Sequence, residues 1–194
     1  MKNNIYIYVA PVCKFKDNDV LPEFAKQEID KINYLNSINQ KKAVWGLLHK
    51  AIEEVKGFDD DFYHIEKNEN GKPISKKYFL SISHCEDLVA VAVSNENVGI
   101  DIERVDKNKN FNRLIRYISH PLEKLPSNTE TLYGAWVKKE AKFKFEGGKT
   151  FFPKNINTST FSSKVFSFNY QDDIYYLAIV ADNLECVEIK NLTN

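Results

Sequence analysis

Residues 98–103 read Val98-Gly99-Ile100-Asp101-Ile102-Glu103, an alternation of apolar and acidic side chains that begins with a valine and a glycine. In an extended strand, side chains two positions apart point to the same side, so Asp101 and Glu103 would share one small volume. The pattern therefore predicts a strand that carries a pair of neighbouring carboxylates.

Two further extended segments come before this strand, over residues 78–83 and 88–94. Both are rich in apolar and β-branched residues, and short polar stretches at 84–87 and 95–97 separate the three segments. This order predicts an antiparallel meander of the three strands.

Upstream, residues 5–10 form a short alternating run that predicts a first strand, and residues 22–34 and 40–56 predict two helices. A turn cluster, Asn68-Glu69-Asn70-Gly71-Lys72-Pro73, lies between these helices and the strands. Asn-Gly favours positive φ and Pro73 is expected to end regular pairing, so the chain should reverse here.

Downstream, residues 111–118 predict a helix, and a longer helix is expected over residues 130–145. Asn128 or Thr129 would cap the longer helix, and Gly147-Gly148 would end it. Strands are expected after it over residues 161–168, 174–180 and, more weakly, 184–189.

These elements place the chain in the α+β class. Each half reads as a long helix plus about three strands, which predicts two similar α+β lobes, each a small antiparallel sheet packed with a long helix. We expect the N-terminal lobe to span residues 1–97 and the C-terminal lobe, which carries the acidic residues, to span 98–194. A cleft between two such lobes is a usual place for a small-molecule site.

The longer C-terminal helix carries a second acidic pattern, Trp136-Val137-Lys138-Lys139-Glu140-Ala141-Lys142-Phe143-Lys144. The helical period puts Trp136, Glu140 and Lys144 on one face, so an acid lies beside a base. Together with Asp101 and Glu103, Glu140 would offer three hard oxygen ligands of the kind that suits Mg²⁺, which completes its shell with water and substrate phosphate. The two patterns therefore predict a metal-held phosphate site.

Composition excludes several classes of protein. The chain has 194 residues, 43% of them hydrophobic, which is too much apolar surface for a disordered protein. Lys+Arg and Asp+Glu both number 27, so no net field favours nucleic acid or an anionic membrane. We also see no apolar run of the roughly 20 residues that a membrane span needs. Neither nucleic-acid binding nor membrane insertion is expected.

Three cysteines, Cys13, Cys85 and Cys186, are an odd number without paired metal spacing. They favour a reducing, cytoplasmic setting over a disulfide framework or a zinc site. No Walker-type glycine loop or dinucleotide fingerprint is present, which removes the commoner nucleotide enzymes.

Four blocks in order carry a family resemblance. They are Gly71-Lys72-Pro73, Leu80-Ser81-Ile82-Ser83-His84, residues 98–103 and residues 136–144. At these separations the chain resembles the 4′-phosphopantetheinyl transferases, and most closely the longer, surfactin-synthetase-activating (Sfp) type, which is holo-acyl-carrier-protein synthase-like. The resemblance covers about residues 71–148.

The resemblance implies a pseudo-dimer of two α+β lobes with coenzyme A and Mg²⁺ or Mn²⁺ bound between them. It implies transfer of 4′-phosphopantetheine from coenzyme A, the co-substrate, to a serine of an acyl or peptidyl carrier protein, with release of adenosine 3′,5′-bisphosphate. Carrier proteins of this kind serve fatty acid, polyketide or nonribosomal peptide biosynthesis. Because both lobes lie in one chain, we expect a monomer.

Roles follow position by position from the resemblance. It implies that Lys144 acts at the diphosphate, while Lys42, with its neighbour Lys41, stands where a basic residue meets the 3′-phosphate. From the chemistry of the transfer, we expect Glu140, or a metal-bound water that it orients, to accept the serine proton. The implied metal ligands are Asp101, Glu103 and Glu140, and the implied coenzyme contacts are Lys42, Lys72, Ser83, His84 and Lys144.

The chain also departs from the family pattern at two places. Cys85 follows the histidine where Ser or Thr is usual, and residues 32–35 lack an arginine pair often found before the first long helix. The first difference affects a hydroxyl contact to the coenzyme, and the second affects binding of its 3′-phosphate.

Plainer interpretations stand beside these roles. Taken singly, Asp101 and Glu103 could be exposed acids at a strand end, and Glu140 with Lys144 a surface pair one helical turn apart. His84 alone is as consistent with a structural histidine as with a ligand. The rival functions are a magnesium-dependent phosphohydrolase built on the same acids, and a non-catalytic module that binds coenzyme A or a carrier protein.

Overall fold

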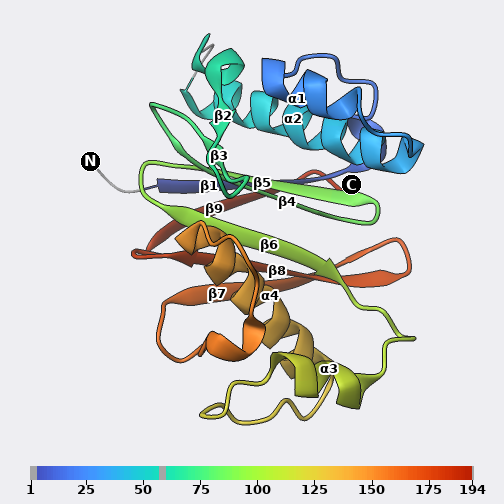
Figure 1. Ribbon diagram of the computed structural model, residues 1–194, viewed down its shortest axis with the longest axis vertical. Coiled ribbons are helices and arrows are strands. Elements are labelled where there is room, and N and C mark those ends of the chain that lie inside the picture. The colour runs from blue at the N-terminus through green and yellow to red at the C-terminus, as the bar shows by residue number, and fades with distance from the viewer. Residues whose placement is uncertain (1–3, 57–59, 194) are drawn as a thin grey trace.

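The computed structural model describes residues 4–56 and 60–193 and mixes helices with strands (Figure 1). The predicted α+β class is confirmed. The elements are β1 (Asn4–Pro11), η1 (Val12–Lys14), α1 (Glu23–Ile29), α2 (Leu35–Lys56), η2 (Asp60–His64), β2 (Glu66–Lys67), β3 (Pro73–Ile74), β4 (Phe79–Cys85), β5 (Leu88–Ser94), β6 (Val98–Arg104), α3 (Phe111–Ile118), α4 (Thr129–Glu146), η3 (Pro153–Asn155), β7 (Ser163–Tyr170), β8 (Asp173–Ala181) and β9 (Cys186–Asn191).

The strands form two main sheets that face each other. One has the order β4-β5-β1-β9 and the other the order β6-β8-β7, while β2 and β3 make a small hairpin. Figure 1 shows the layers, with α2 on the outer side of the first sheet and α4 on the outer side of the second. Within the part of the chain that the structure describes, none of the helices has the length and apolar character needed to span a membrane.

Each pair of neighbouring layers shares its own apolar cluster. Leu47 of α2 packs in the cluster that α2 makes with the first sheet, and Ile7 and Ile100 lie in the cluster between the two sheets. Val137 of α4 belongs to the third cluster, which α4 makes with the second sheet. Because β5 lies between α2 and the second sheet, all seven of its residues are buried, and its near-continuous apolar sequence follows from this.

The predicted three-strand meander is wrong for its last strand. Strands β4 and β5 do pair as an antiparallel hairpin, but β6 pairs with β8 in the other sheet. A strand has only two edges for pairing, and those of β5 are taken by β4 and β1. After the turn at residues 95–97, β6 therefore has to find its partner elsewhere.

Side chains of β4, rather than backbone, meet the free edge of β6. Ser81 Oγ accepts a hydrogen bond from the Ile100 N–H at 3.0 Å, and Ser83 Oγ accepts one from the Ile102 N–H at 3.2 Å. Cys85 Sγ receives the next N–H in the series, that of Arg104, at 3.2 Å. We call these three contacts the seam, because they join the first sheet to the second.

The C-terminal strand also departs from expectation. The weak strand predicted near residues 184–189 is present as β9, but it runs parallel to β1, with Ile5 opposite Val187. The first sheet is therefore mixed, and the prediction of a small antiparallel sheet in each half is wrong for it. As a result, the last strand of the chain lies in the sheet of the first half.

The helices before the strands shift along the chain relative to the prediction. α1 ends at Ile29 instead of residue 34, and α2 begins at Leu35 instead of residue 40. Ile38 packs against the core beneath α2, so the earlier turn of the helix continues the apolar face. Pro73 does not end pairing, because as the first residue of β3 it lies opposite Lys67 and needs no donor there.

The C-terminal helices match the prediction closely. α3 spans residues 111–118 as expected, and Asn128 caps α4 in a capping box. Asn128 Oδ1 accepts from the Thr131 N–H at 2.8 Å, while Thr131 Oγ1 accepts from the Asn128 N–H at 3.2 Å. Gly147 ends the helix with a left-handed φ of 65°.

One glycine sets how closely α4 approaches the second sheet. A Cβ built on Gly99 of β6 would lie 2.5 Å from the backbone nitrogen of Phe145, and closer still to the carbonyl oxygen of Ala141. Both are backbone atoms of α4, which cannot turn aside as a flexible side chain can. The contact therefore depends on glycine at this position.

We predict that Gly99→Ala destabilises the protein by about 1–3 kcal/mol or more, because α4 must move off β6. Gly134→Ala is the matched control, since a Cβ at Gly134 meets nothing within 4 Å and alanine favours a helix by up to about 1 kcal/mol. Urea unfolding of the two variants measures both effects. A Gly99→Ala protein as stable as the wild type would contradict the close approach.

Candidate active site

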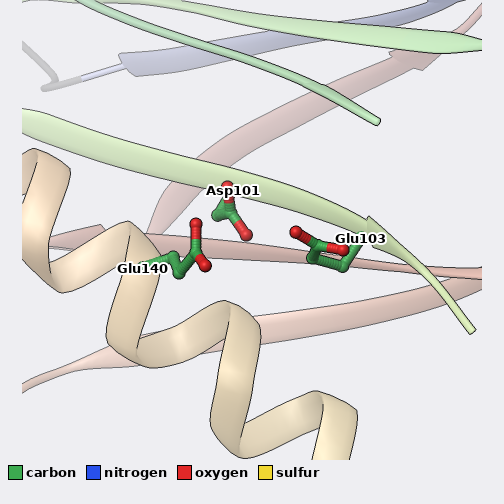
Figure 2. Close-up of side chains that lie close together, drawn as sticks. All are labelled: Asp101, Glu103 and Glu140. Atoms are coloured by element: carbon green, nitrogen blue, oxygen red, sulfur yellow. The ribbon is translucent and has the colours of Figure 1, made fainter. Parts of the chain in front are cut away.

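Three carboxylates from two elements converge beside β6. Asp101 and Glu103 lie on the same side of β6, and Glu140 reaches them from α4 (Figure 2). One oxygen of each side chain lies within 4.8 Å of the others. Asp101 is buried, with 2% of its surface exposed, and Glu103 and Glu140 are half-buried. The structure thus brings together the three acids singled out in the sequence.

Crowding and burial disfavour full ionisation of this cluster. Burial, and next the charge of Asp101, raise the pKa of Glu103 above its ordinary value. The same two causes, in the same order, raise the pKa of Glu140 to about 8. Three ionised carboxylates at this spacing repel one another, and a cation among them would relieve the repulsion.

A lysine and a serine hold the buried carboxylate. Lys144 Nζ lies 2.7 Å from Asp101 Oδ1 and donates to Ser83 Oγ at 2.8 Å. Ser83 Oγ in turn donates to Asp101 Oδ1 at 2.9 Å and accepts from the Ile102 N–H in the seam. The hydroxyl thereby uses its one hydrogen and both lone pairs.

The second carboxylate oxygen of Asp101 indicates whether the cluster fits a metal ion. Asp101 Oδ2 is buried and has no hydrogen-bond partner among the residues that the structure describes. An unpartnered buried carboxylate oxygen is costly unless a cation or water binds it. Hard oxygen donors within 4.8 Å of one another suit a divalent metal such as Mg²⁺, so the residues present fit one.

Two of the expected coenzyme contacts have other partners in the structure. Lys42 Nζ lies 2.8 Å from Asp19 Oδ1. Lys72 Nζ donates to Asn97 Oδ1 at 2.8 Å and to the Phe145 carbonyl at 3.3 Å, at the C-terminal end of α4. Lys72 also lines a cavity of about 390 Å³ with Gly147. These contacts of Lys42 and Lys72 are with residues outside the acid cluster. Ser83 and Lys144, in contrast, both contact Asp101.

His84 lies next to Ser83 on β4 and presents an exposed surface. Desolvation first, and then the charge of Lys144, lower the pKa of His84, with a further contribution from Lys41. A neutral imidazole close to two ammonium groups results.

Three further residues near the site have contacts that the sequence analysis did not predict. Lys109 lies 5.6 Å from the ring centre of Trp136, and its charge acts on both Glu103 and Glu140. Cys85, noted only as a departure, belongs to the seam, and burial followed by the charge of Glu103 raises its pKa to about 12.

The third is Lys139, which the sequence presents as one more residue of the α4 motif. It is completely buried, and its Nζ lies 2.7 Å from Glu123 Oε2 and 3.2 Å from the Pro153 carbonyl. No local signal distinguishes Lys139 from the half-buried lysines beside it, because its partners lie in distant segments of the chain.

The chain is similar to a protein named 4′-phosphopantetheinyl transferase gsp from Aneurinibacillus migulanus. The two are 28% identical over 132 residues, which cover 64% of this chain and 56% of that protein. The resemblance to the Sfp-type 4′-phosphopantetheinyl transferase superfamily, predicted from the four motifs, is thus confirmed, although no protein-family model matches the chain. The match spans little more than half the length of this curated relative.

We predict that metal-free protein loses stability as the pH rises from about 5 to 8. The pKa of Glu140 is raised from 4.5 to about 8 in the folded state, so in this range the folded state holds a proton that the unfolded state has released. The unfolded state binds fewer protons, and the free energy of unfolding therefore falls with pH. Thermal unfolding in the presence of a chelator measures the slope, which should be shallower in Glu140→Gln.

Added Mg²⁺ should reverse this loss at pH 8, because it binds the ionised carboxylates of the folded state alone. The unfolding temperature should rise with Mg²⁺ in the wild type and much less in Glu140→Gln. Equal pH slopes and equal Mg²⁺ responses in the two proteins would show that Glu140 is not part of a metal site.

Proposed function

We propose that the protein transfers 4′-phosphopantetheine from coenzyme A to a serine of an acyl or peptidyl carrier protein, with Mg²⁺, and releases adenosine 3′,5′-bisphosphate. The observation that carries the proposal is the cluster of Asp101 with two further carboxylates, in which Asp101 Oδ2 has no partner among the described residues and Lys144 lies on the other oxygen. The similarity to a protein named as a 4′-phosphopantetheinyl transferase supports the same reaction.

The layers of the fold support two similar lobes with the substrates between them. Each lobe would consist of one sheet and its covering helix, α2 or α4, and the chain passes from the first sheet to the second at residues 95–97. We place the boundary between residues 97 and 98, with β9 returning to the first lobe. Since one chain supplies every acid of the site, a monomer is sufficient.

Asp101, Glu103 and Glu140 would hold Mg²⁺, or Mn²⁺ in its place. When bound, the ion supplies a Lewis acid at the diphosphate of coenzyme A. Once the metal ion binds Asp101, the ammonium group of Lys144 is available to the same phosphates. It would stabilise the negative charge that builds on the phosphate oxygens during transfer.

The serine of the carrier protein has to lose its proton as it attacks the β-phosphorus. Glu140, or a metal-bound water that it orients, is our candidate acceptor, because a carboxylate that faces both the metal and the serine can relay the proton without moving. The proton passes from the serine hydroxyl to Glu140, and the bond from the β-phosphorus to the oxygen of adenosine bisphosphate breaks.

Other residues would bind the coenzyme. Ser83 and His84 flank Lys144, and Lys72 lines the 390 Å³ cavity at the end of α4. Lys42, half-buried on α2 beside Lys41, would meet the 3′-phosphate. The unpaired state of the three cysteines supports a cytoplasmic setting, where thiols are kept reduced.

The decisive experiment incubates the protein with coenzyme A, Mg²⁺ and an apo carrier protein, and weighs the carrier. We expect a gain of one phosphopantetheine arm on serine, which a chelator abolishes. Asp101→Ala should lower the rate at least about 100-fold, and Lys144→Ala should lower kcat by about 10²–10³-fold with a smaller change in KM. Glu130→Gln, an exposed acid on the same helix as Lys144, should leave the rate unchanged.

Three results would contradict the proposal. Phosphate release without any carrier protein would indicate a phosphohydrolase. Binding of coenzyme A without turnover would indicate a non-catalytic module. Wild-type rates in Asp101→Ala would remove the acid cluster from the reaction.

A further inference from the structure

A second group of charges lies on the other lobe and has no part in the chemistry above. Lys41 of α2 and Lys67 of β2 both contact the carboxylate of Glu28 on α1. Lys41 Nζ lies 2.5 Å from Glu28 Oε2, and Lys67 Nζ lies 2.6 Å from Oε1 and 2.7 Å from Oε2. Three elements distant in the sequence thus meet at one anion.

This carboxylate lies where an anion is otherwise disfavoured. Glu28 is in the last turn of α1, where the partial charge of the helix end is negative. Partial burial alone would raise the pKa of Glu28, but hydrogen bonds from Lys41 and Lys67 outweigh it and hold the pKa below its ordinary value. Glu28 is therefore an anion at neutral pH that is held between two ammonium groups.

The group is open to solvent and to ligands. About a third of each side chain of Lys41, Lys67 and Glu28 is exposed, at 32%, 28% and 33%. Lys67 is also held in place over the ring of Phe24, with its Nζ 5.3 Å from the ring centre. Two fixed ammonium groups around a replaceable carboxylate form a site that a phosphate monoester, with more charge and a third terminal oxygen, can enter.

The position of the group connects it to the acid cluster. Gln40, the neighbour of Lys41 on α2, donates to the Glu86 carbonyl at 2.8 Å, just after β4, and Ser83 of β4 accepts from Lys144 at 2.8 Å. The charges of Lys41 and Lys144 both act on His84 between these contacts. A ligand with two separate phosphate groups could therefore contact Lys144 with one and Lys41 with the other. Coenzyme A has this form, with a diphosphate and a 3′-phosphate monoester on its ribose.

We propose that Glu28 is an internal competitor of the 3′-phosphate, whose carboxylate holds Lys41 and Lys67 until the coenzyme displaces it. This inference rests on the proposed function and adds to it a residue that determines specificity. Coenzyme A gains two ammonium contacts but must break the ion pairs of Glu28. The protein should therefore discriminate weakly between coenzyme A and 3′-dephospho-coenzyme A.

The test measures dissociation constants of both coenzymes, with Mg²⁺, for wild type, Glu28→Gln and Glu23→Gln. Glu23→Gln is the matched control, because Glu23 lies on the same helix and pairs only with exposed Lys26, at 3.5 Å. We expect Glu28→Gln to bind coenzyme A about threefold to fivefold more tightly, with 3′-dephospho-coenzyme A unchanged, and the gain to shrink at high salt. Glu23→Gln should show the wild-type ratio.

Lys67→Gln gives an independent arm if Glu28→Gln does not fold, as checked by circular dichroism. It should weaken coenzyme A binding by a similar factor and leave 3′-dephospho-coenzyme A unchanged. Equal effects on the two coenzymes in either variant would make these residues a structural tie between α1, α2 and β2 and overturn the inference alone. A wild type that binds neither coenzyme would overturn the proposed function, and this inference with it.

Discussion

The free edge of β6 is the constraint on which the arrangement depends. Among the residues that the structure describes, β6 has only β8 as a backbone partner, and the N–H groups on its other side would be buried and unsatisfied without the hydroxyls of Ser81 and Ser83. Two sheets that share no backbone ladder are joined in this way. Ser83 also donates to Asp101, so the contact that joins the two sheets is the one that orients the most buried acid of the cluster.

α4 has to lie close to β6 for Glu140 to reach Asp101, and several contacts impose this. Gly99 removes the side chain that would hold the helix away. At the C-terminal end of α4, Lys72 and Asn97 both donate to the carbonyl of Phe145, and near its middle the buried Lys139 binds distant loops. The geometry of the acid cluster is thus a property of the packing of α4, and only indirectly of the acids themselves.

Local features of this chain were predictable because their causes are local. The alternation in β6 predicted that Asp101 and Glu103 share a side, the helical period predicted the face of Glu140 and Lys144, and Asn128 was named as a possible cap of α4. The pairing partners of β6 and β9 could not be predicted, because they depend on which strand edges remain free. That α4 converges on β6 was inferred from pairing the two acidic patterns and from the family resemblance, because the residue spacing within either motif says nothing about the distance between them.

Three of the lysines that we propose to bind phosphate share one physical principle. Lys144 is paired with Asp101, and Lys41 and Lys67 are paired with Glu28, so these three cations are already neutralised by carboxylates. Ligand binding is then an exchange of ion pairs in which most of the Coulomb energy cancels, and its net strength depends on the small remainder. A chain with equal numbers of acidic and basic residues can bind a highly charged ligand in this way without a strong net field. Discrimination between ligands then depends on how each one compares with the internal carboxylate that it replaces.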